Sequence, residues 1–496
     1  MAGFIGLILI TTLFTALAYP PTNYDSMTYH MARVSNWINN QSIEFYPVLN
    51  QRQNYQPPLA EYTILFLQIL TGSDIFANCV QWFCFAGCIA LAYLITGEFF
   101  ESQPLQLLAA FIASTIPMAI LQASSTQNDL VVSFFIMAFA LFMIKLKQEF
   151  SAGNVIFCGL SLALALMTKG TALIYCAAIG ICLAMPLLRS NKRIKYATVL
   201  SAIVLFALIF NSGLAVRNCK MYGNPFSPDS GEYRNEKIAL FSGLIRNAAM
   251  HLGINSPELK KLEHELISSI LGEDINNPQT TWKGSSFASY YSRHEDTAGN
   301  AIHMLLLLYI FVTIPFWIKK VPGDFRWYFS AVFAGFVLFC LVLKWQPWCS
   351  RLHTPFFMLG SVIIPGVLAR SFKPREYFLF LIVLFSYSIP FLVLNQSRNL
   401  VSLDWLNKDR NELMFNDNPG LYQDHLATAK FIRQNKIKEA GLITGIDDWE
   451  YPIWVMNKNV KINNKVPEYI ISTVPTIPPG YFEIFSSHNI RILQKQ

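Results

Sequence analysis

The chain alternates between long apolar runs and short polar segments. A helix of about 20 apolar residues can cross the roughly 30 Å hydrocarbon core of a bilayer. Runs of this kind predict eleven transmembrane helices, near residues 2–19, 75–97, 104–122, 127–146, 152–168, 170–188, 195–213, 301–318, 327–344, 352–369 and 377–394. Because backbone polar groups in lipid must pair internally, the expected fold class is an all-α polytopic membrane protein.

Two apolar segments are interpreted separately. Residues 57–72, "PPLAEYTILFLQILTG", are short, begin with two prolines and carry Glu61, so we expect an interfacial helix along the membrane surface. The first run ends in "ALAYPP", which resembles a signal-peptide cleavage site. No basic residues precede it, so we expect a retained first helix.

Residues 395–496 have a different pattern. A helical repeat covers 422–434, and short apolar strands are expected at 441–444 and within "VPEYIISTV". The predicted organisation is therefore a transmembrane module at 1–394, with a first outer loop at 20–74 and a long outer loop at 214–300. A small extracytoplasmic α/β domain is expected to follow at 395–496.

Charge sets the predicted orientation. The chain is 53% hydrophobic and 14% charged, with a net charge of +7, and much of the excess lies in short basic clusters between apolar runs. Eleven spans place these clusters in the cytoplasm: Lys145/Lys147, Arg189/Lys192/Arg193/Lys195, Lys319/Lys320/Arg326 and Arg370/Lys373/Arg375. We therefore expect a multi-pass inner or plasma membrane protein with a cytoplasmic N-terminus, an extracytoplasmic (periplasmic) C-terminal domain and no nucleic-acid partner.

The segment "NYDSMTYHMARVSNW", residues 23–37, follows the first run and concentrates charge at the membrane edge. On a helix beginning near Asp25, the polar residues Asp25, Thr28, Tyr29, Arg33 and Asn36 share one face, and Met27, Met31, Val34 and Ile38 share the other. This pattern predicts an amphipathic helix on the bilayer. Spacing alone leaves two roles for Asp25, a helix N-cap or a functional acid.

Several short motifs occur in a characteristic order. They are the acid of the first outer loop, "YQPPLAEY", "STQND", "TKGT", "RNCKMYGNPFSP", "HEDTAGNAIH" and "WQPWCSRLHTP". Together they cover roughly residues 1–395 and resemble the GT-C superfamily of integral-membrane glycosyltransferases. The resemblance is to the bacterial branch similar to protein O-mannosyltransferases and lipid A aminoarabinose transferases. Gln56 stands where relatives often have a lysine.

The resemblance implies an inverting glycosyltransferase that moves a hexose or pentose from a polyprenyl-phosphate carrier to an acceptor hydroxyl on the outer face. Asp25 is then the general base. A phosphate leaving group needs no protonation, so one base and a few cations suffice, unlike the two carboxyl groups of glycosidases. The implied partners are the lipid-linked donor, membrane lipids and a lipid, glycan or protein acceptor.

The remaining candidates have alternative structural roles. Arg351 and Lys169 are the candidates for the donor phosphate, although a lysine between apolar helices can also snorkel. Asp129 is either a substrate contact or a helix N-cap. The candidates for binding sugar or acceptor are Tyr29, His30, Arg33, Gln56, Asp129, Arg217, His294, Glu295, Asp296 and His353.

No cofactor is indicated, and no pair of histidines or cysteines has the spacing of a metal site, so no divalent metal is indicated either. Two alternatives stay open. A transporter or lipid flippase would also be polytopic, but such proteins tend to have internal repeats and charges at mid-membrane. A ligase or polymerase that uses lipid-linked oligosaccharides differs only in the size of its donor.

Overall fold

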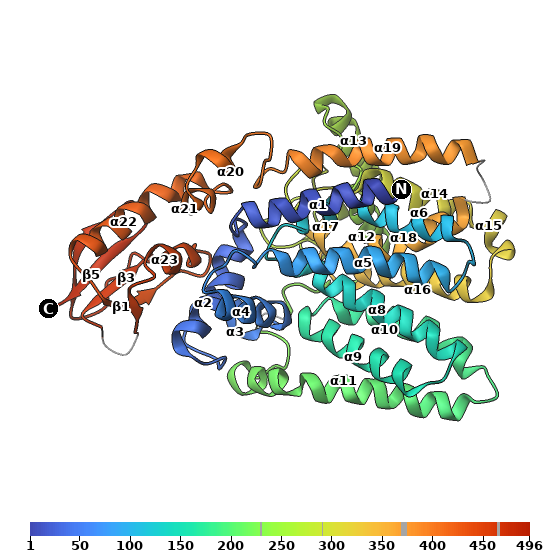
Figure 1. The fold of residues 1–496 in the computed structure, drawn as a ribbon, viewed down its shortest axis with the longest axis horizontal. Coiled ribbons are helices and arrows are strands. Elements are labelled where there is room, and N and C mark those ends of the chain that lie inside the picture. The colour runs from blue at the N-terminus through green and yellow to red at the C-terminus, as the bar shows by residue number, and fades with distance from the viewer. Residues whose placement is uncertain (229–230, 290, 369–373, 464–466) are drawn as a thin grey trace. The chain divides into compact units, whose positions relative to one another are not determined.

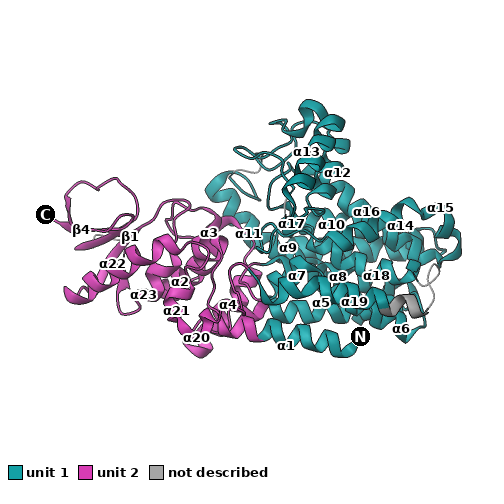
Figure 2. Cartoon of the chain, turned by 90° about the horizontal axis from the view of Figure 1, so that it is seen from above, with its two compact units in different colours: residues 1–13, 81–123, 128–395 teal, residues 14–80, 124–127, 396–496 magenta. Residues whose placement is uncertain are grey.

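The computed structural model describes residues 1–228, 231–289, 291–368, 374–463 and 467–496, with only the backbone for 374–378. The chain divides into two compact units (Figure 2). Unit 1 comprises Met1–Leu13, Gln81–Ala123 and Asn128–Asn395, and unit 2 comprises Phe14–Val80, Ser124–Gln127 and Gln396–Gln496. Of the predicted basic clusters, Arg370 and Lys373 and the side chain of Arg375 lie outside the described residues.

Apolar helices form most of unit 1 (Figure 1). In chain order they are α1 (Ala2–Ala18) and α5 (Cys79–Gly97), both shared with unit 2, α6 (Gln103–Ser114), α7 (Pro117–Gln122), α8 (Asp129–Gln148), α9 (Ala152–Thr168), α10 (Ala172–Leu188), α11 (Arg193–Tyr222), α14 (Ala301–Val312), α15 (Ile314–Trp317), η3 (Ile318–Lys320), α16 (Gly323–Val342), α17 (Cys349–Leu352), α18 (Thr354–Leu368) and α19 (Pro374–Val393). The long loop between α11 and α14 carries α12 (Leu240–Ala249), α13 (Pro257–Leu271) and η2 (Gly272–Ile275).

Every predicted span contains a helix, but the helices differ in length. Among the described residues, four are long and apolar enough to cross a membrane, namely α5, α8, α11 and α16. Helices α14 and α15–η3, joined by a 65° bend, would make a fifth span. Shorter apolar helices of 10–17 residues occupy the other predicted spans and the predicted interfacial segment, which forms α4 (Leu59–Thr71). The predicted count of eleven spans therefore stays a prediction.

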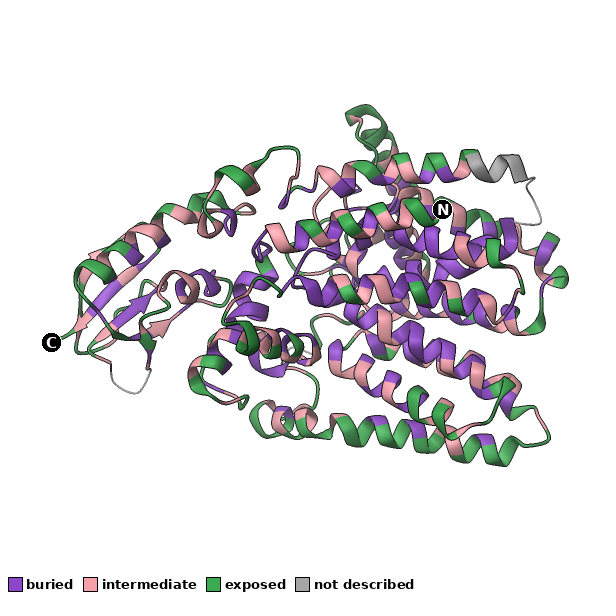
Figure 3. Ribbon diagram, in the orientation of Figure 1, coloured by how far each residue is buried: buried purple, intermediate pink, exposed green. Residues whose placement is uncertain are grey.

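Burial separates inner from outer helices. In α8, 78% of the apolar window is buried, whereas in α11 only 11% is (Figure 3). Apolar side chains such as Val204, Leu205 and Ile209 are exposed on α11. A helix that is apolar and exposed has the character expected of a lipid-facing surface.

Proline breaks two of the predicted spans. The span expected at 104–122 is divided into α6 and α7, because Ile116 before Pro117 is extended and cannot continue the helix. The span expected at 301–318 bends at Thr313, two residues before Pro315.

The span expected at 195–213 was too short. Helix α11 continues to Tyr222 and is ended by Gly223, which has φ +70°.

Unit 2 combines the loop at residues 20–74 with the C-terminal part of the chain. Its loop helices are the π-helix η1 (Ser26–His30), α2 (Met31–Asn40), α3 (Arg52–Tyr55) and α4 (Leu59–Thr71), and its C-terminal helices are α20 (Asp404–Asn407), α21 (Arg410–Leu413), η4 (Pro419–Leu421), α22 (Tyr422–Gln434) and α23 (Tyr451–Met456). On α4, Phe66, Ile69 and Leu70 are exposed, which suits an interfacial helix.

A five-stranded sheet completes unit 2, with the order β2-β1-β3-β5-β4. Its strands are β1 (Glu439–Ile443), β2 (Lys461–Ile462), β3 (Tyr469–Ser472), β4 (Tyr481–Ser486) and β5 (Arg491–Lys495). Strands β2, β1 and β3 are parallel, β5 is antiparallel to β3 and β4, and apolar residues of α22, β1, β3 and β5 form their shared core. The predicted helix at 422–434 and both predicted strands are confirmed, whereas β2, β4 and β5 were missed.

Candidate functional site

The predicted site residues fall into two groups, one in each unit. Unit 2 contains Asp25, Tyr29, His30, Arg33 and Gln56. Unit 1 contains Asp129, Lys169, Arg217, His294, Glu295, Asp296, Arg351 and His353.

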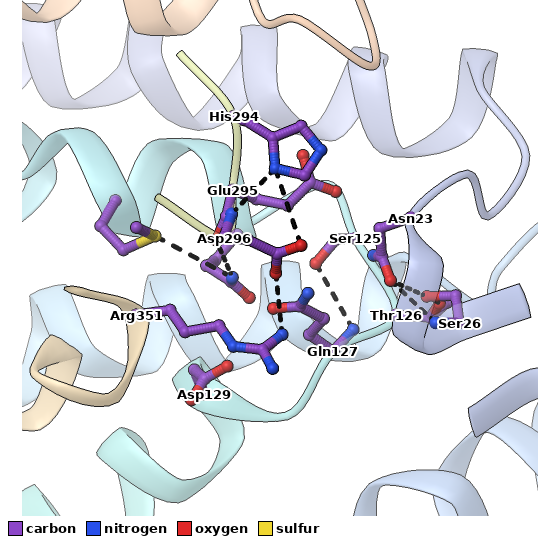
Figure 4. A network of polar contacts seen from close by, with 12 residues as sticks. Asn23, Ser26, Ser125, Thr126, Gln127, Asp129, His294, Glu295, Asp296 and Arg351 are labelled. Atoms are coloured by element: carbon purple, nitrogen blue, oxygen red, sulfur yellow. Dashed lines mark hydrogen bonds and ion pairs between the residues drawn. The ribbon is translucent and has the colours of Figure 1, made fainter. Parts of the chain in front are cut away.

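Asp25 does not act as a helix cap. It precedes the π-helix η1, and its side chain makes no capping hydrogen bond. Instead, Oδ1 of Asn23 accepts hydrogen bonds from the backbone N–H and the hydroxyl of Ser26, at 2.8 and 2.7 Å. The Ser26 hydroxyl also bonds that of Thr126 (Figure 4). Asn23 therefore takes the structural role that the sequence left open for Asp25, and π-helical turns are frequent at functional sites.

A cation accompanies Asp25 in unit 2. Burial alone lowers the pKa of the Arg52 guanidinium, but Tyr29, Asp25 and two further groups raise it more, so its net pKa lies above the ordinary value. Arg52 also lies over the ring of Tyr29, 5.1 Å from its centroid, and donates a 2.6 Å hydrogen bond to Asp447. The motifs of the sequence do not single out Arg52.

His30 and Arg33 surround a buried acid. Nδ1 of His30 lies 2.5 Å from Oε1 of Glu61, and a guanidinium nitrogen of Arg33 lies 3.6 Å from the same oxygen. Arg33 also donates to the backbone oxygens of Arg52 and Gln56, each at 2.9 Å, and to that of Gln53. The side chains of Arg33 and Glu61 are 1% and 0% exposed. The Arg33 guanidinium therefore fixes the backbone of the segment that carries Arg52. Gln56 takes part in this contact through its backbone carbonyl.

Another buried acid, Glu450, comes from the C-terminal part of the chain. One of its carboxylate oxygens accepts from the Asn36 amide at 2.7 Å, and the other accepts from the Gln53 amide at 2.8 Å. Thr444 and Trp454 donate to the same carboxylate, at 3.1 and 3.0 Å. Glu450 therefore ties α23 to α2 and α3 within unit 2, a contact that sequence analysis missed.

The prediction of an amphipathic helix beginning near Asp25 is wrong in one respect. Its apolar face was expected to lie on the bilayer, but Met27, Met31 and Val34 are fully buried, and only Ile38 is exposed. Its polar face is also buried, because the loop and C-terminal segments of unit 2 pack around both faces. The helix is an internal element of this unit.

In unit 1, Asp129 and Lys169 form an ion pair. Nζ of Lys169 lies 2.5 Å from Oδ1 of Asp129, whose side chain is 1% exposed, against 20% for the lysine. The alternative of an N-cap role for Asp129 is wrong, since Asn128 is the N-cap of α8 and Asp129 is its first residue. An acid in the first helical turn is also favoured by the helix dipole.

Arg351 of α17 pairs with Asp296 of the loop before α14. A guanidinium nitrogen of Arg351 lies 2.8 Å from Oδ1 of Asp296, and Nδ1 of His294 lies 3.7 Å from Oδ2 (Figure 4). The neighbouring Glu295 is fully buried, and its carbonyl accepts a 2.7 Å bond from the Gln122 amide. The structure thus brings together the predicted "HED" residues and Arg351, which are distant in sequence.

His353 lies in a buried histidine pair. Its Nδ1 is 2.9 Å from Nε2 of His251, and the rings of Phe336 and Phe339 pack against it. Both rings are fully buried. The pair is therefore internal, which does not suit a sugar contact.

Two further points complete the placement. Arg217 lies within α11 and is half-buried, rather than in the loop beyond the helix as expected. Among the residues that the structure describes, no three His, Cys, Asp or Glu side chains gather closely enough to hold a metal ion.

Comparisons with known proteins identify the class of fold. The fold of the chain, including its small C-terminal sheet, is similar to that of solved structures given below, and the resemblance indicated by the motifs is confirmed. The family model described as dolichyl-phosphate-mannose-protein mannosyltransferase matches residues 55–210. No curated protein sequence gave a significant match.

One solved structure that the chain resembles is that of ArnT from Cupriavidus metallidurans. The crystal structure of that protein bound to undecaprenyl phosphate matches with a TM-score of 0.58 and 11% sequence identity, covering 99% of this chain and 97% of that chain. Its apo state matches with a TM-score of 0.56 and 12% identity over the same shares of each chain.

Proposed function

We propose that the protein is an inverting glycosyltransferase that transfers a sugar from a polyprenyl phosphate to an acceptor hydroxyl on the outer face of a membrane. The observation that carries the proposal is the position of Asp25. It is only 7% exposed, makes no capping bond and interacts with the cation Arg52. The full-length similarity to ArnT, solved with undecaprenyl phosphate, supports the class of donor.

The chemistry follows from the charge of the donor. A phosphate departs as an anion and needs no acid, so the reaction needs a base that removes the proton of the attacking hydroxyl. On this proposal, the Asp25 carboxylate accepts that proton as the acceptor oxygen bonds the anomeric carbon from the face opposite the phosphate. The anomeric C–O bond to the phosphate breaks with its electron pair on the phosphate, and configuration is inverted.

Cations of unit 1 are proposed to receive the leaving phosphate. Arg351 can form two parallel bonds to phosphate oxygens, and Lys169 can supply a point charge. In the structure, both pair with acids that are themselves candidate sugar contacts, Asp296 and Asp129. An incoming phosphate would exchange with these carboxylates. His294 and Tyr29 complete the proposed polar contacts, whereas His30, Arg33, Glu295 and His353 are at most 1% exposed and contact other internal groups, so they are assigned structural roles.

The outer face is proposed from charge alone. Basic clusters such as Arg189/Lys192/Arg193/Lys195 mark the cytoplasmic ends of the helices, and Asp25, Asp296 and Arg351 then lie at the opposite ends. The C-terminal domain is proposed to share this outer side.

Mass spectrometry of envelope lipids and glycans tests the function. Cells lacking the protein are expected to lose one sugar from an envelope lipid, glycan or protein and to accumulate the lipid-phosphate sugar that donates it. Complementation with the unchanged chain should restore the sugar. Identical profiles with and without the protein would contradict the proposal.

Arg351→Ala is expected to weaken donor binding and raise the KM for the donor about 10- to 100-fold. Hydrogen bonds to charged groups contribute about 1.5–3 kcal/mol. The matched control is Arg193→Ala, because Arg193 is exposed and belongs to a predicted cytoplasmic cluster rather than to the proposed site. Its donor KM should equal that of the unchanged chain. Steady-state kinetics on purified protein measure both variants. Equal rises in KM for the two variants would contradict a role for Arg351 in donor binding.

A further inference from the structure

A hollow lies in the long loop of unit 1. It encloses about 720 Å³, and its lining includes Glu232, Glu236, Trp282, Lys283, Ser285 and Lys344. None of these residues belongs to the proposed transfer site. Sites for small ligands typically enclose about 300–1,000 Å³ and combine apolar side chains with a few polar groups. The hollow has the size and mixed lining of such a site.

Backbone hydrogen bonds make one wall of the hollow rigid. The chain leaving α16 pairs with two loop segments: Lys344 N–H donates to Tyr233 O, and Trp345 N–H donates to Thr280 O, each at 2.9 Å. Trp282 N–H in turn donates to Trp345 O at 2.9 Å. The wall is therefore set before any ligand arrives, which reduces the entropy lost on binding.

A buried arginine supports the same wall from behind. Arg246 of α12, which is 1% exposed, donates to Thr280 O at 3.2 Å and to the Thr280 and Thr281 hydroxyls at 3.0 and 2.7 Å. It also donates to Ile275 O at 3.1 Å. Helix α12, labelled in Figure 2, thus supports the segment that presents Trp282.

Trp282 provides an ordered aromatic surface. Its ring stacks on Tyr233 with centroids 4.4 Å apart and 19° between the planes, and Trp348 meets it edge-on at 6.3 Å. These contacts hold the indole in one orientation while the side chain stays half-buried and lines the hollow. An indole fixed in this way can pack against the apolar face of a flat ligand.

The charged groups of the hollow carry both signs. Nζ of Lys344 lies 2.6 Å from Oε1 of Glu236, and the lysine side chain is 9% exposed, against 56% for the glutamate. Glu232 and Lys283 add one exposed group of each sign. The two carboxylates would repel a simple anion. An apolar ligand would exclude water from the charged groups without offering them hydrogen bonds, which costs free energy. A ligand must therefore both donate and accept hydrogen bonds.

We propose that this hollow is a saccharide-binding site. Sugar hydroxyls donate to carboxylates and accept from ammonium groups, and the C–H face of a sugar ring suits an indole surface. Trp282 is the stacking residue, Glu232 and Glu236 accept hydrogen bonds, and Lys344 and Lys283 donate them. The site goes beyond the transfer reaction proposed above and does not rest on it.

Saturation-transfer NMR on the full chain in lipid nanodiscs tests the site, with mannose, glucose, N-acetylglucosamine and maltose as probes. At least one probe is expected to show saturation of its ring protons. Trp282→Ala should raise the Kd of that probe at least about tenfold, as expected when an aromatic contact is lost. Trp282→Phe should bind with intermediate affinity. Glu232→Gln changes an exposed side chain that folding does not require, and it should also weaken binding.

The matched control is Trp405→Ala, because Trp405 packs on Phe14 in unit 2 and does not line the hollow. Its saccharide affinity should equal that of the unchanged chain. The proposal is overturned if no probe binds, if Trp282→Ala and Glu232→Gln bind as tightly as the unchanged chain, or if inorganic phosphate binds in place of the sugars. The assay detects binding without transfer, so a negative result leaves the proposed reaction unaffected.

Discussion

Replacing Asp25 by asparagine is expected to reduce kcat for sugar transfer by about 10²–10⁴-fold, the usual contribution of a general base. The amide has the shape of the carboxylate but cannot accept the proton of the acceptor. Folding should be preserved, because Asn23 rather than Asp25 caps η1. Turnover by purified protein and its thermal unfolding temperature measure the two effects separately.

Asp447→Asn is the matched control for this variant. Asp447 also interacts with Arg52, through a 2.6 Å hydrogen bond, but its own side chain is 66% exposed. If the only role of Asp25 were to neutralise Arg52, the two variants would lose similar activity. We expect Asp447→Asn to keep most of its turnover. Normal turnover by Asp25→Asn would discard the proposed mechanism.

Replacing Glu61 by alanine is expected to lower the free energy of unfolding by about 3–5 kcal/mol. Removing one partner of a buried ion pair leaves the other charge uncompensated. Here the stranded group is Arg33, which is 1% exposed. Because Arg33 also donates to the backbone of Arg52, the loop beside Asp25 should loosen as well. Denaturant unfolding in detergent, followed by tryptophan fluorescence, measures the change.

Glu44→Ala is the control, because Glu44 lies on the same loop but is exposed, and its effect should stay within about 0.5 kcal/mol. If Glu61→Ala lowers the free energy of unfolding no more than Glu44→Ala does, the buried cluster contributes little to stability.

The contribution of Glu61 to the free energy of unfolding is expected to depend on pH. Burial by itself raises the pKa of the Glu61 carboxyl, but His30 and Arg33 lower it more, so its net pKa lies below the usual value. The stabilisation it provides is present above the unfolded-state pKa of about 4.3 and is lost as pH falls through the folded-state pKa. The difference in unfolding free energy between the unchanged chain and Glu61→Ala should therefore shrink as pH is lowered from about 5 toward 3.

Much of the fold could be predicted because it depends on local pattern. A run of apolar residues specifies a helix in lipid wherever its neighbours lie, and each predicted span contains one. The helical repeat at 422–434 is confirmed as α22 for the same reason. Errors in bounds arose at Pro117, where backbone geometry breaks a helix within an apolar run, and at the end of α11, which continues beyond the apolar run as far as Gly223.

The site could be predicted only in part. The types of residue near Asp25 and Arg351 were evident from motifs, but their partners were not. Glu450 bonds Asn36 across 414 residues of sequence, and Arg351 pairs with Asp296 across 55. No periodicity links such positions, so Arg52, Asp447 and Glu450 were missed. The role of Asp25 as a cap was also undecidable from spacing, because Asn23 and Asp25 are both good capping residues.

The sequence by itself determined that this is a helical membrane chain with a small α/β part, and which acids and cations its loops carry. The tertiary structure decided which of those charges form buried pairs. It also decided that Asn23 rather than Asp25 caps η1, and that Trp282 lines a hollow. The physical reason is the range of the forces involved. Hydrophobic periodicity acts over a few residues along the chain, whereas ion pairing, burial and cavity shape depend on contacts that exist only after distant segments have packed together.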